Sequence, residues 1–318
     1  MVFILLSEII TLKDGIEILK KRNYDVLINF YEVEKARGNY IQAKQFYNPN
    51  FSISYSSINY DPKLRAFYDD NNTQFSAGIN WDLIDISGKR FYSIQASYSN
   101  WIAQEYLFRS SLREIIIQFI NQFFQTLSDK EYLNYLKDDF SNYETFLDIL
   151  SKKYEIGSLS YVDYLKFKFY KLELENAIKE AQLNYENDLR ELSFLLGGGN
   201  YEPSIKNDTI LESLEINELL KKAYENRSDL KAFKNTKDFY DYELKLYKAY
   251  LIPDTYFQFQ YDPIGTEYTP RFGIGLSFDL PFFDRKQGFI NYYQAQIKQV
   301  EILMSKTIEN IKLDIETS

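Results

Sequence analysis

The sequence predicts a mainly α-helical chain with a small antiparallel β part: a long coiled-coil hairpin and four membrane β-strands. Three observations carry this prediction. The stretch 89–153 contains neither proline nor glycine. Four short stretches alternate apolar and small polar residues, as β-strands do. The order helix, strand, strand, long helix occurs twice along the chain.

Composition limits the classes of protein this can be. Of the 318 residues, 45% are hydrophobic and 26% are charged, which is typical of a folded chain. The net charge of -9 disfavours a nucleic-acid binder. Since Cys and His are absent, disulfides, Cys/His metal sites and Ser-His-Asp triads are excluded, and no cofactor is expected. The 29 Tyr and 25 Phe indicate either membrane-interface belts or a general compositional bias.

The first 83 residues predict one helix and two strands. A helical pattern runs from Ser7 to about Tyr47, with an N-cap at 11–14, and Asn48-Pro49 ends it. The stretches 51–56 and 75–83 then alternate, at about the nine residues of a tilted membrane strand. Between them, Asp61-Pro62 and the polar run 69–72 predict a solvated loop. No run approaches the roughly 20 apolar residues of a membrane helix, and the apolar start lacks a signal peptide's basic region. Either export is not intended or the chain begins after a lost leader.

A helical hairpin follows. The helix from Lys89 to Lys153 would be on the order of 95 Å long at about 1.5 Å per residue. Gly157 breaks it, and a second arm from Ser160 to Leu196 ends at three glycines. A heptad seam marks the first arm as one side of a coiled coil. Its residues are Leu133, Leu136, Phe140, Tyr143, Leu147 and Leu150.

The opening pattern then returns. After a predicted linker, 200–215, come a helix at 219–249, strands at 255–261 and 272–280, and a helix from Gln287. Phe75, Gly78, Asp82 and Leu83 match Phe272, Gly275, Asp279 and Leu280 in register. We therefore expect a first repeat at 1–199 and a second at 216–318. A second hairpin as long as the first would need roughly 75–80 more residues, so the second repeat is expected to be incomplete.

The strands set a physical requirement. Four strands cannot close a barrel, and an open edge cannot lie in lipid with unpaired backbone groups. Three chains would supply about twelve strands, a number usual for outer membrane barrels. A soluble antiparallel sheet with one wet face explains the alternation equally well, but it gives no use for such long helical arms. The apolar positions are Phe51, Ile53, Tyr55, Phe75, Ala77, Ile79, Trp81, Leu83, Phe257, Phe259, Tyr261, Phe272, Ile274, Leu276, Phe278 and Leu280.

Five short motifs, in this order and with the duplication, carry a resemblance to a known family. They are 47–53 (YNPNFSI), Tyr154-Glu155-Ile156-Gly157 with Asp163-Tyr164-Leu165, 195–197 (LLG), 226–230 (NRSDL) and 275–284 (GLSFDLPFFD). With them the chain resembles the outer membrane efflux protein family, the trimeric channel-tunnel components of tripartite efflux pumps and type I secretion systems.

The resemblance implies a fold, a function and partners. Three chains would share a twelve-stranded barrel in the outer membrane lipid, continued by an α-helical barrel across the periplasm. The homotrimer would export substrates passively, while an inner-membrane transporter supplies the energy and a periplasmic adaptor docks at the hairpin tips. No enzyme activity and no nucleic-acid partner are implied.

The resemblance also implies site residues. Ile156, Gly157, Ser158 and Leu159 would form the adaptor-facing tip, and Asp163 would help to hold the entrance closed by pairing with the second hairpin. Each has a plainer explanation. Any hairpin turn uses a glycine with positive φ, and an acidic residue in the first turn of a helix is favoured by the helix dipole. Asp82 and Asp279 stand at matching strand ends, where they would line the lumen or form hydrogen bonds at its periplasmic rim.

Two other classes of function fit the sequence less well. For an enzyme, Gly273-Ile274-Gly275 lacks the rest of a dinucleotide motif, and the glycines at 197–199 are not followed by Lys-Ser/Thr. A soluble or periplasmic coiled-coil structural or adaptor protein without transport activity remains the alternative. Adaptors pair a single helical hairpin with many later strands, and the duplicated element order disfavours them.

Overall fold

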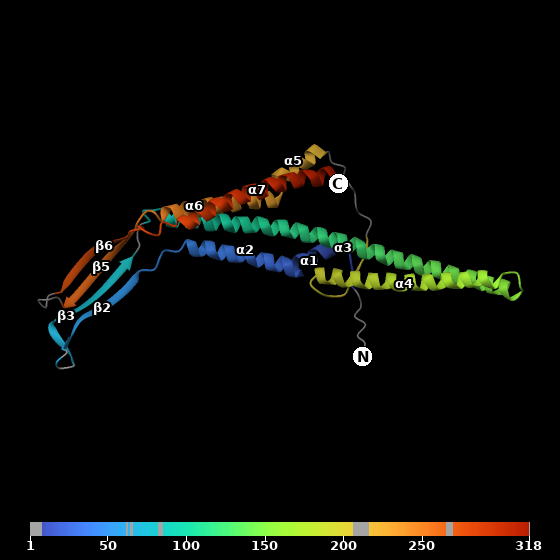
Figure 1. Ribbon diagram of the computed structural model, residues 1–318, viewed down its shortest axis with the longest axis horizontal. Helices are drawn as coiled ribbons and strands as arrows, with labels where there is room; N and C mark the ends of the chain where they lie inside the picture. The colour runs from blue at the N-terminus through green and yellow to red at the C-terminus, as the bar shows by residue number, and fades with distance from the viewer. Residues whose placement is uncertain are drawn as a thin grey trace. The chain divides into compact units, whose positions relative to one another are not determined.

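The structure, a computed structural model, describes residues 8–61, 63, 66–81, 85–205, 216–264 and 270–317 (Figure 1). The chain divides into two compact units, residues 1–31 with 108–213 and residues 32–107 with 214–318. The helices are α1 Leu12–Arg22, α2 Tyr24–Ala43, α3 Lys89–Glu155, α4 Tyr161–Leu195, α5 Ile216–Asn226, α6 Ser228–Ala249 and α7 Gln287–Thr317. The strands are β1 Glu8–Ile10, β2 Asn50–Asp61, β3 Ala66–Trp81, β4 Tyr201–Pro203, β5 Asp254–Ile264 and β6 Arg271–Asp279.

The first unit begins with a short strand and a capped helix, where the sequence predicted one unbroken helix from Ser7. The predicted N-cap is confirmed, because Thr11 and Asp14 form a capping box. The prediction of a single helix is wrong, because the backbone is extended at Asn23. The Asn23 amide donates to Leu195 O (2.8 Å) and its side-chain oxygen accepts from Val26 N (3.0 Å), so this side chain separates α1 from α2.

Part of the predicted linker is also a strand. β4 pairs in parallel with β1, so that Glu8 lies opposite Tyr201 and Ile10 opposite Pro203. Residues 206–215 of that linker lie outside the described residues. The ribbon adjoins the apolar core of this unit, in which the largest fully buried side chains include Phe119, Phe123, Ile10, Leu19, Leu192 and Leu196.

The hairpin of α3 and α4 matches its prediction closely. α3 has 67 residues, which corresponds to roughly 100 Å of helix. The seam is confirmed: Leu133, Leu136 and Leu150 are buried, and the other three seam positions are half-buried. Leu133 and Leu136 pack with α4 residues Ala177, Ile178, Ala181 and Tyr185.

The second unit contains an antiparallel sheet with the strand order β2-β3-β5-β6 (Figure 1). All four predicted strands are present, and β2 and β3 are longer than expected. The polar run 69–72 is not a loop but part of β3, because pairing resumes after an irregularity at Ser56/Ile58 and places Ile58 opposite Asp69. Backbone pairing with β2 therefore outweighs the low strand propensity of this run.

Two helices replace the predicted helix 219–249. α5 and α6 are separated at Arg227, which is extended, and the guanidinium of Arg227 pairs with Asp229 (2.7 Å). α6 then packs along α7, where Lys237 pairs with Glu301 (2.7 Å). The order helix, strand, strand, long helix thus occurs twice in the described residues. The division into repeats at 199 and 216 remains a prediction.

Candidate functional site

The tip of the α3–α4 hairpin is built by backbone geometry. Gly157 has a φ of 77°, and its N–H donates to Tyr154 O (3.0 Å). Ser158 donates from its N–H and from its hydroxyl to Lys153 O, both at 2.9 Å. The two bonds from backbone N–H groups are those of a Schellman motif, which satisfies the last carbonyls of α3. The predicted role of Gly157 as a turn residue with positive φ is therefore confirmed.

Ser160 begins the returning helix. Its hydroxyl accepts from Asp163 N (3.1 Å) and donates to Asp163 Oδ2 (2.7 Å), while Lys166 pairs with Asp163 Oδ1 (3.0 Å). The hydrogen bond from Ser160, followed by that from Lys166, holds the pKa of Asp163 below its ordinary value. These contacts all lie in the first turns of α4, as expected for a capping carboxylate.

The surface of the tip is apolar and aromatic. Ile156 is 79% exposed, whereas Leu159 is half-buried. Tyr154 of α3 stacks on Tyr164 of α4 with ring centroids 4.9 Å apart, and Tyr161 lies 6.0 Å from Tyr154. This stack was not predicted from the sequence. The available signal was the i, i+3 spacing of Tyr161 and Tyr164 directly after the turn, with a tyrosine on the opposite arm.

The sheet gathers its apolar side chains on one face. Directly opposite residues share a face, and Ile79 lies opposite both Phe51 and Phe259, which in turn lies opposite Ile274. This apolar face is strongly exposed in the single chain, and Ile274 reaches 80%. β2 and β6 each pair with one strand among the described residues, so the sheet has two open edges.

The other face of the sheet is polar. Ser54 and Ser76 share a hydrogen bond (2.6 Å), and Gln258 donates to Ser277 (3.2 Å). Asp279, the last residue of β6, accepts from the Tyr256 hydroxyl (3.1 Å). Its predicted counterpart Asp82 lies outside the described residues.

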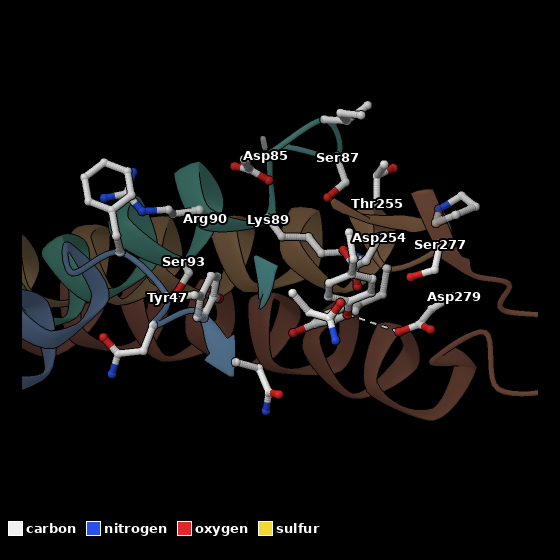
Figure 2. A pocket seen from close by; sticks show the side chains of 18 of the residues that line it. Tyr47, Asp85, Ser87, Lys89, Arg90, Ser93, Asp254, Thr255, Ser277 and Asp279 are labelled. Atoms are coloured by element: carbon white, nitrogen blue, oxygen red, sulfur yellow. Dashed lines mark hydrogen bonds and ion pairs between the residues drawn. The ribbon is translucent and has the colours of Figure 1, made fainter. Parts of the chain in front are cut away.

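A pocket of about 810 Å³ lies where the strands of the second unit meet its helices (Figure 2). Lys89, the first residue of α3, points toward Asp254 and pairs with it (2.6 Å). Lys89 also donates to Ile252 O (3.2 Å) and lies 4.6 Å from the Tyr250 ring centroid. The sequence analysis missed this pair, because Lys89 and Asp254 are far apart in the sequence and neither belongs to a motif.

Arg90 lines the same pocket. Its Nη2 donates to Lys44 O (2.6 Å), and its guanidinium lies 4.2 Å from the ring centroid of Phe46. Asp85, just before α3, accepts from Phe91 N (3.2 Å). The two cations and two of the carboxylates in this pocket therefore have partners. Lys89 joins α3 to β5, Arg90 joins α3 to the end of α2, and Asp85 contacts the first turn of α3. In the part of the chain that the structure describes, no group of acidic residues could hold a metal ion. None of the described helices is both long enough and apolar enough to cross a membrane.

Comparison with known proteins identifies the family. The model of a family described as outer membrane efflux protein matches residues 16–198. This chain belongs to the outer membrane efflux protein family. No curated protein matches the chain.

Solved members share the fold. The CmeC outer membrane channel of Campylobacter jejuni is similar with a TM-score of 0.76 and 18% identity, over 94% of this chain and 68% of that chain. The outer membrane protein VceC of Vibrio cholerae is similar with a TM-score of 0.74 and 18% identity, over 94% of this chain and 75% of that one. CusC, described as forming a transmembrane channel, gives a TM-score of 0.69 and 17% identity, over 96% and 72%.

Family membership confirms the fold class, the class of function and the location that the sequence predicted. As an outer membrane efflux protein, the chain is a subunit of an outer membrane export channel that extends into the periplasm. Such channels are homotrimers that act with periplasmic adaptors and inner-membrane transporters. The soluble coiled-coil alternative is disfavoured. Members of the family are passive channels.

Proposed function

We propose that three copies of this outer membrane efflux protein close one barrel and export substrates passively through it, with no catalytic step of their own. The observation that carries the proposal is the sheet of the second unit, in which one face is apolar and exposed and neither edge strand has a second partner among the described residues. Lipid would cover the apolar face, and joining β6 to β2 of the next copy would pair the open edges.

The hairpin tip is proposed as the adaptor-facing surface, formed by Ile156, Gly157, Ser158 and Leu159. The strong exposure of Ile156 supports this role, because a large apolar side chain held at a rigid turn suits burial by a partner protein. The half-buried Leu159 would support the turn more than contact the adaptor. The stacked Tyr154 and Tyr164 would hold the surface in shape.

Two acidic roles complete the proposal. Asp163 would help to keep the entrance closed, although its contacts with Ser160 and Lys166 support the plainer capping role. The variant Asp163→Asn distinguishes the capping role from the gating role. A capping role predicts weaker hairpin stability at unchanged channel conductance, and a gating role predicts raised conductance. Asp279 is proposed to bind at the rim of the lumen, as its bond from Tyr256 at the end of β6 suggests, and Asp82 would occupy the matching place.

The first experiment tests assembly. Protein extracted in detergent should run as a trimer in SDS and as a monomer only after boiling, because a closed barrel leaves no strand edge for SDS to attack. A chain that remains soluble and monomeric without detergent would refute the proposal.

A pair of adjacent variants tests which face meets lipid. Leu276→Arg places a cation on the apolar face, where it should cost about 2–4 kcal/mol in the bilayer and abolish the heat-sensitive trimer. Ser277→Arg places the same cation on the polar face and should leave the trimer intact. Equal loss in both variants would contradict the assignment of faces.

A further inference from the structure

One end of the sheet, where all four strands meet the helices, carries an unusual set of side chains. Asn50 lies opposite Asn80 and Asp254 opposite Asp279, so the start of β2 and of β5 and the end of β3 and of β6 share this end. Aromatic and aliphatic residues lie at or next to the end of each strand here. They are Phe46, Tyr47, Trp81, Tyr250, Leu251, Ile252, Leu280, Phe282 and Phe283.

The segment after β6 is the most exposed part of this end. Phe283 is 97% exposed, and Leu280 and Phe282 are also exposed. A turn shapes the segment, because Phe282 N donates to Leu280 O (2.9 Å). A fully exposed phenylalanine gains nothing from the hydrophobic effect until another apolar surface covers it. Leu280 also continues the alternation of Leu276 and Phe278, so the segment prolongs the apolar face of the sheet.

Cations accompany these rings. Asp284 holds Lys286 through that residue's backbone N–H (3.0 Å) and its ammonium group. Arg285 is exposed and makes no ion pair with the described residues. At the other strand ends, Arg90 lies over the Phe46 ring, and the Trp81 indole N–H donates to Tyr47 O (2.9 Å). The headgroup layer of a membrane favours this combination of side chains: rings with a polar end, exposed apolar groups and a free guanidinium.

We propose that the Leu280–Arg285 segment is a phospholipid anchor: Phe282 and Phe283 enter the boundary between headgroups and acyl chains, and Arg285 binds the lipid phosphate. The partner is a glycerophospholipid of the leaflet nearest the helices. The inference rests on the proposed function, because it requires the apolar face of the sheet to lie in a membrane. It adds the depth at which this segment lies in the membrane and the lipid group that the segment binds.

Because the chain has no cysteine, single labels can be placed without background. The full chain carrying Phe283→Cys is labelled with an environment-sensitive NBD fluorophore and reconstituted in vesicles of phosphatidylethanolamine and phosphatidylglycerol. Lipids with a nitroxide near the headgroup should quench this label at least about twofold more than lipids with a nitroxide deep in the acyl chain. Aqueous iodide should quench it weakly.

Two control positions separate the possible failures. A label at Ile274→Cys, on the apolar face, should be quenched more strongly by the deep nitroxide, and a label at Ile156→Cys, on the hairpin tip, by iodide alone. If position 274 is not quenched by lipid, the proposed function fails. If position 274 behaves as expected while position 283 responds only to iodide, the anchor is refuted and the channel stands. A label at 283 that no quencher reaches would mean that a neighbouring subunit covers it, which also overturns the proposal.

The phosphate contact has its own test in the labelled Phe283→Cys chain. Arg285→Gln should lower quenching by the shallow nitroxide at least about twofold, and Arg285→Lys should retain most of it, since either cation attracts phosphate. Quenching in Arg285→Gln equal to that of the parent chain would overturn the role of Arg285.

Discussion

The hairpin and the sheet of this outer membrane efflux protein differ in where their side chains find partners. In the hairpin, one arm covers the other: seam leucines pack against Ala177 and Ala181, the Tyr143 hydroxyl donates to Phe167 O (3.1 Å), and Lys171 pairs with Glu144 (2.7 Å). In the sheet, the backbone pairs within the chain, but a whole apolar face and two edges have no cover from the described residues.

The difference separates two sources of stability. A hairpin whose contacts lie within one chain can be stable before assembly, and substitutions in it should report on the single chain. A sheet with an open apolar face draws its stability from the bilayer and from neighbouring copies, so substitutions there should report on assembly.

The core beside the hairpin should give the largest effect in the single chain. Phe119 is fully buried, and a Cβ added at Gly15 would lie 2.3 Å from its ring, so the fit is tight. Phe119→Ala should cost about 3–5 kcal/mol. The half-exposed Phe124 on the same helix provides a matched control, and Phe124→Ala should cost much less. Urea unfolding followed by circular dichroism measures both, and similar losses would contradict the described core.

The junction between strands and helices should come next. Lys89 and Asp254 are both largely buried, so Lys89→Met should leave Asp254 without its main partner and cost about 2–3 kcal/mol. Lys35→Met removes the exposed pair with Glu32 and should change stability by less than about 1 kcal/mol. The measurement is the temperature at which the trimer dissociates in SDS. If the two variants dissociate at the same temperature, Lys89 does not tie the strand to the helix.

Two glycine substitutions should have opposite signs. Gly157→Ala forces an L-residue to a φ of 77° and should destabilise the hairpin by about 1 kcal/mol. Gly38→Ala, inside α2 with open space around it, should stabilise by up to about 1 kcal/mol through helix propensity. Thermal unfolding of the two variants should therefore shift in opposite directions, and a shift in the same direction would indicate that the turn is not held in the left-handed region.

A carboxyl pair across the base of the hairpin should give the smallest effect. Burial, followed by a hydrogen bond with Asp129, raises the pKa of Asp188, and Asp188 Oδ2 is buried without a donor among the described residues. A proton shared with Asp129 would satisfy that oxygen. Gln122 and Glu191 also face the group, and Glu191 raises its pKa further.

The sign of the pH dependence follows from this raised pKa. The folded chain binds the proton more tightly than the unfolded one, so this stabilisation is fully present below the ordinary carboxyl pKa and is lost as pH rises through the raised value. Asp188→Asn should flatten that decline. Urea midpoints of both proteins between about pH 3.5 and pH 7 provide the test. Parallel curves would show that the two carboxyls do not share a proton.

The sequence predicted those parts of the fold whose signal is local and repeated. The heptad seam has six successive positions, and the alternation of Phe272 to Phe278 is unbroken, so helix and strand followed from periodicity. The ribbon of β1 and β4 could not be predicted in this way, because three residues of each strand carry no period and each depends on a distant partner. The break at Asn23 depends likewise on a contact with Leu195, far away in the sequence.

In the candidate site, too, the turn was predicted from a local signal and contacts between elements were not predicted. Gly157 is recognisable because a glycine between two long helical patterns has few other uses. The stacking of Tyr154 on Tyr164 joins two helices, and the spacing of tyrosines around the turn is its local signal. The pairing of Lys89 with Asp254 joins a helix to a strand far away in the sequence, and no spacing indicates it.

The pairing of β1 with β4 also has a consequence for the timing of folding. Residue 8 leaves the ribosome about 190 residues before residue 201, an interval of roughly 10–40 s at common rates of synthesis. Throughout that time β1 has no strand to pair with, and Ile10, buried in the finished protein, has no core to enter. The ribbon is therefore a long-range contact that can form only after the returning helix and β4 have been made.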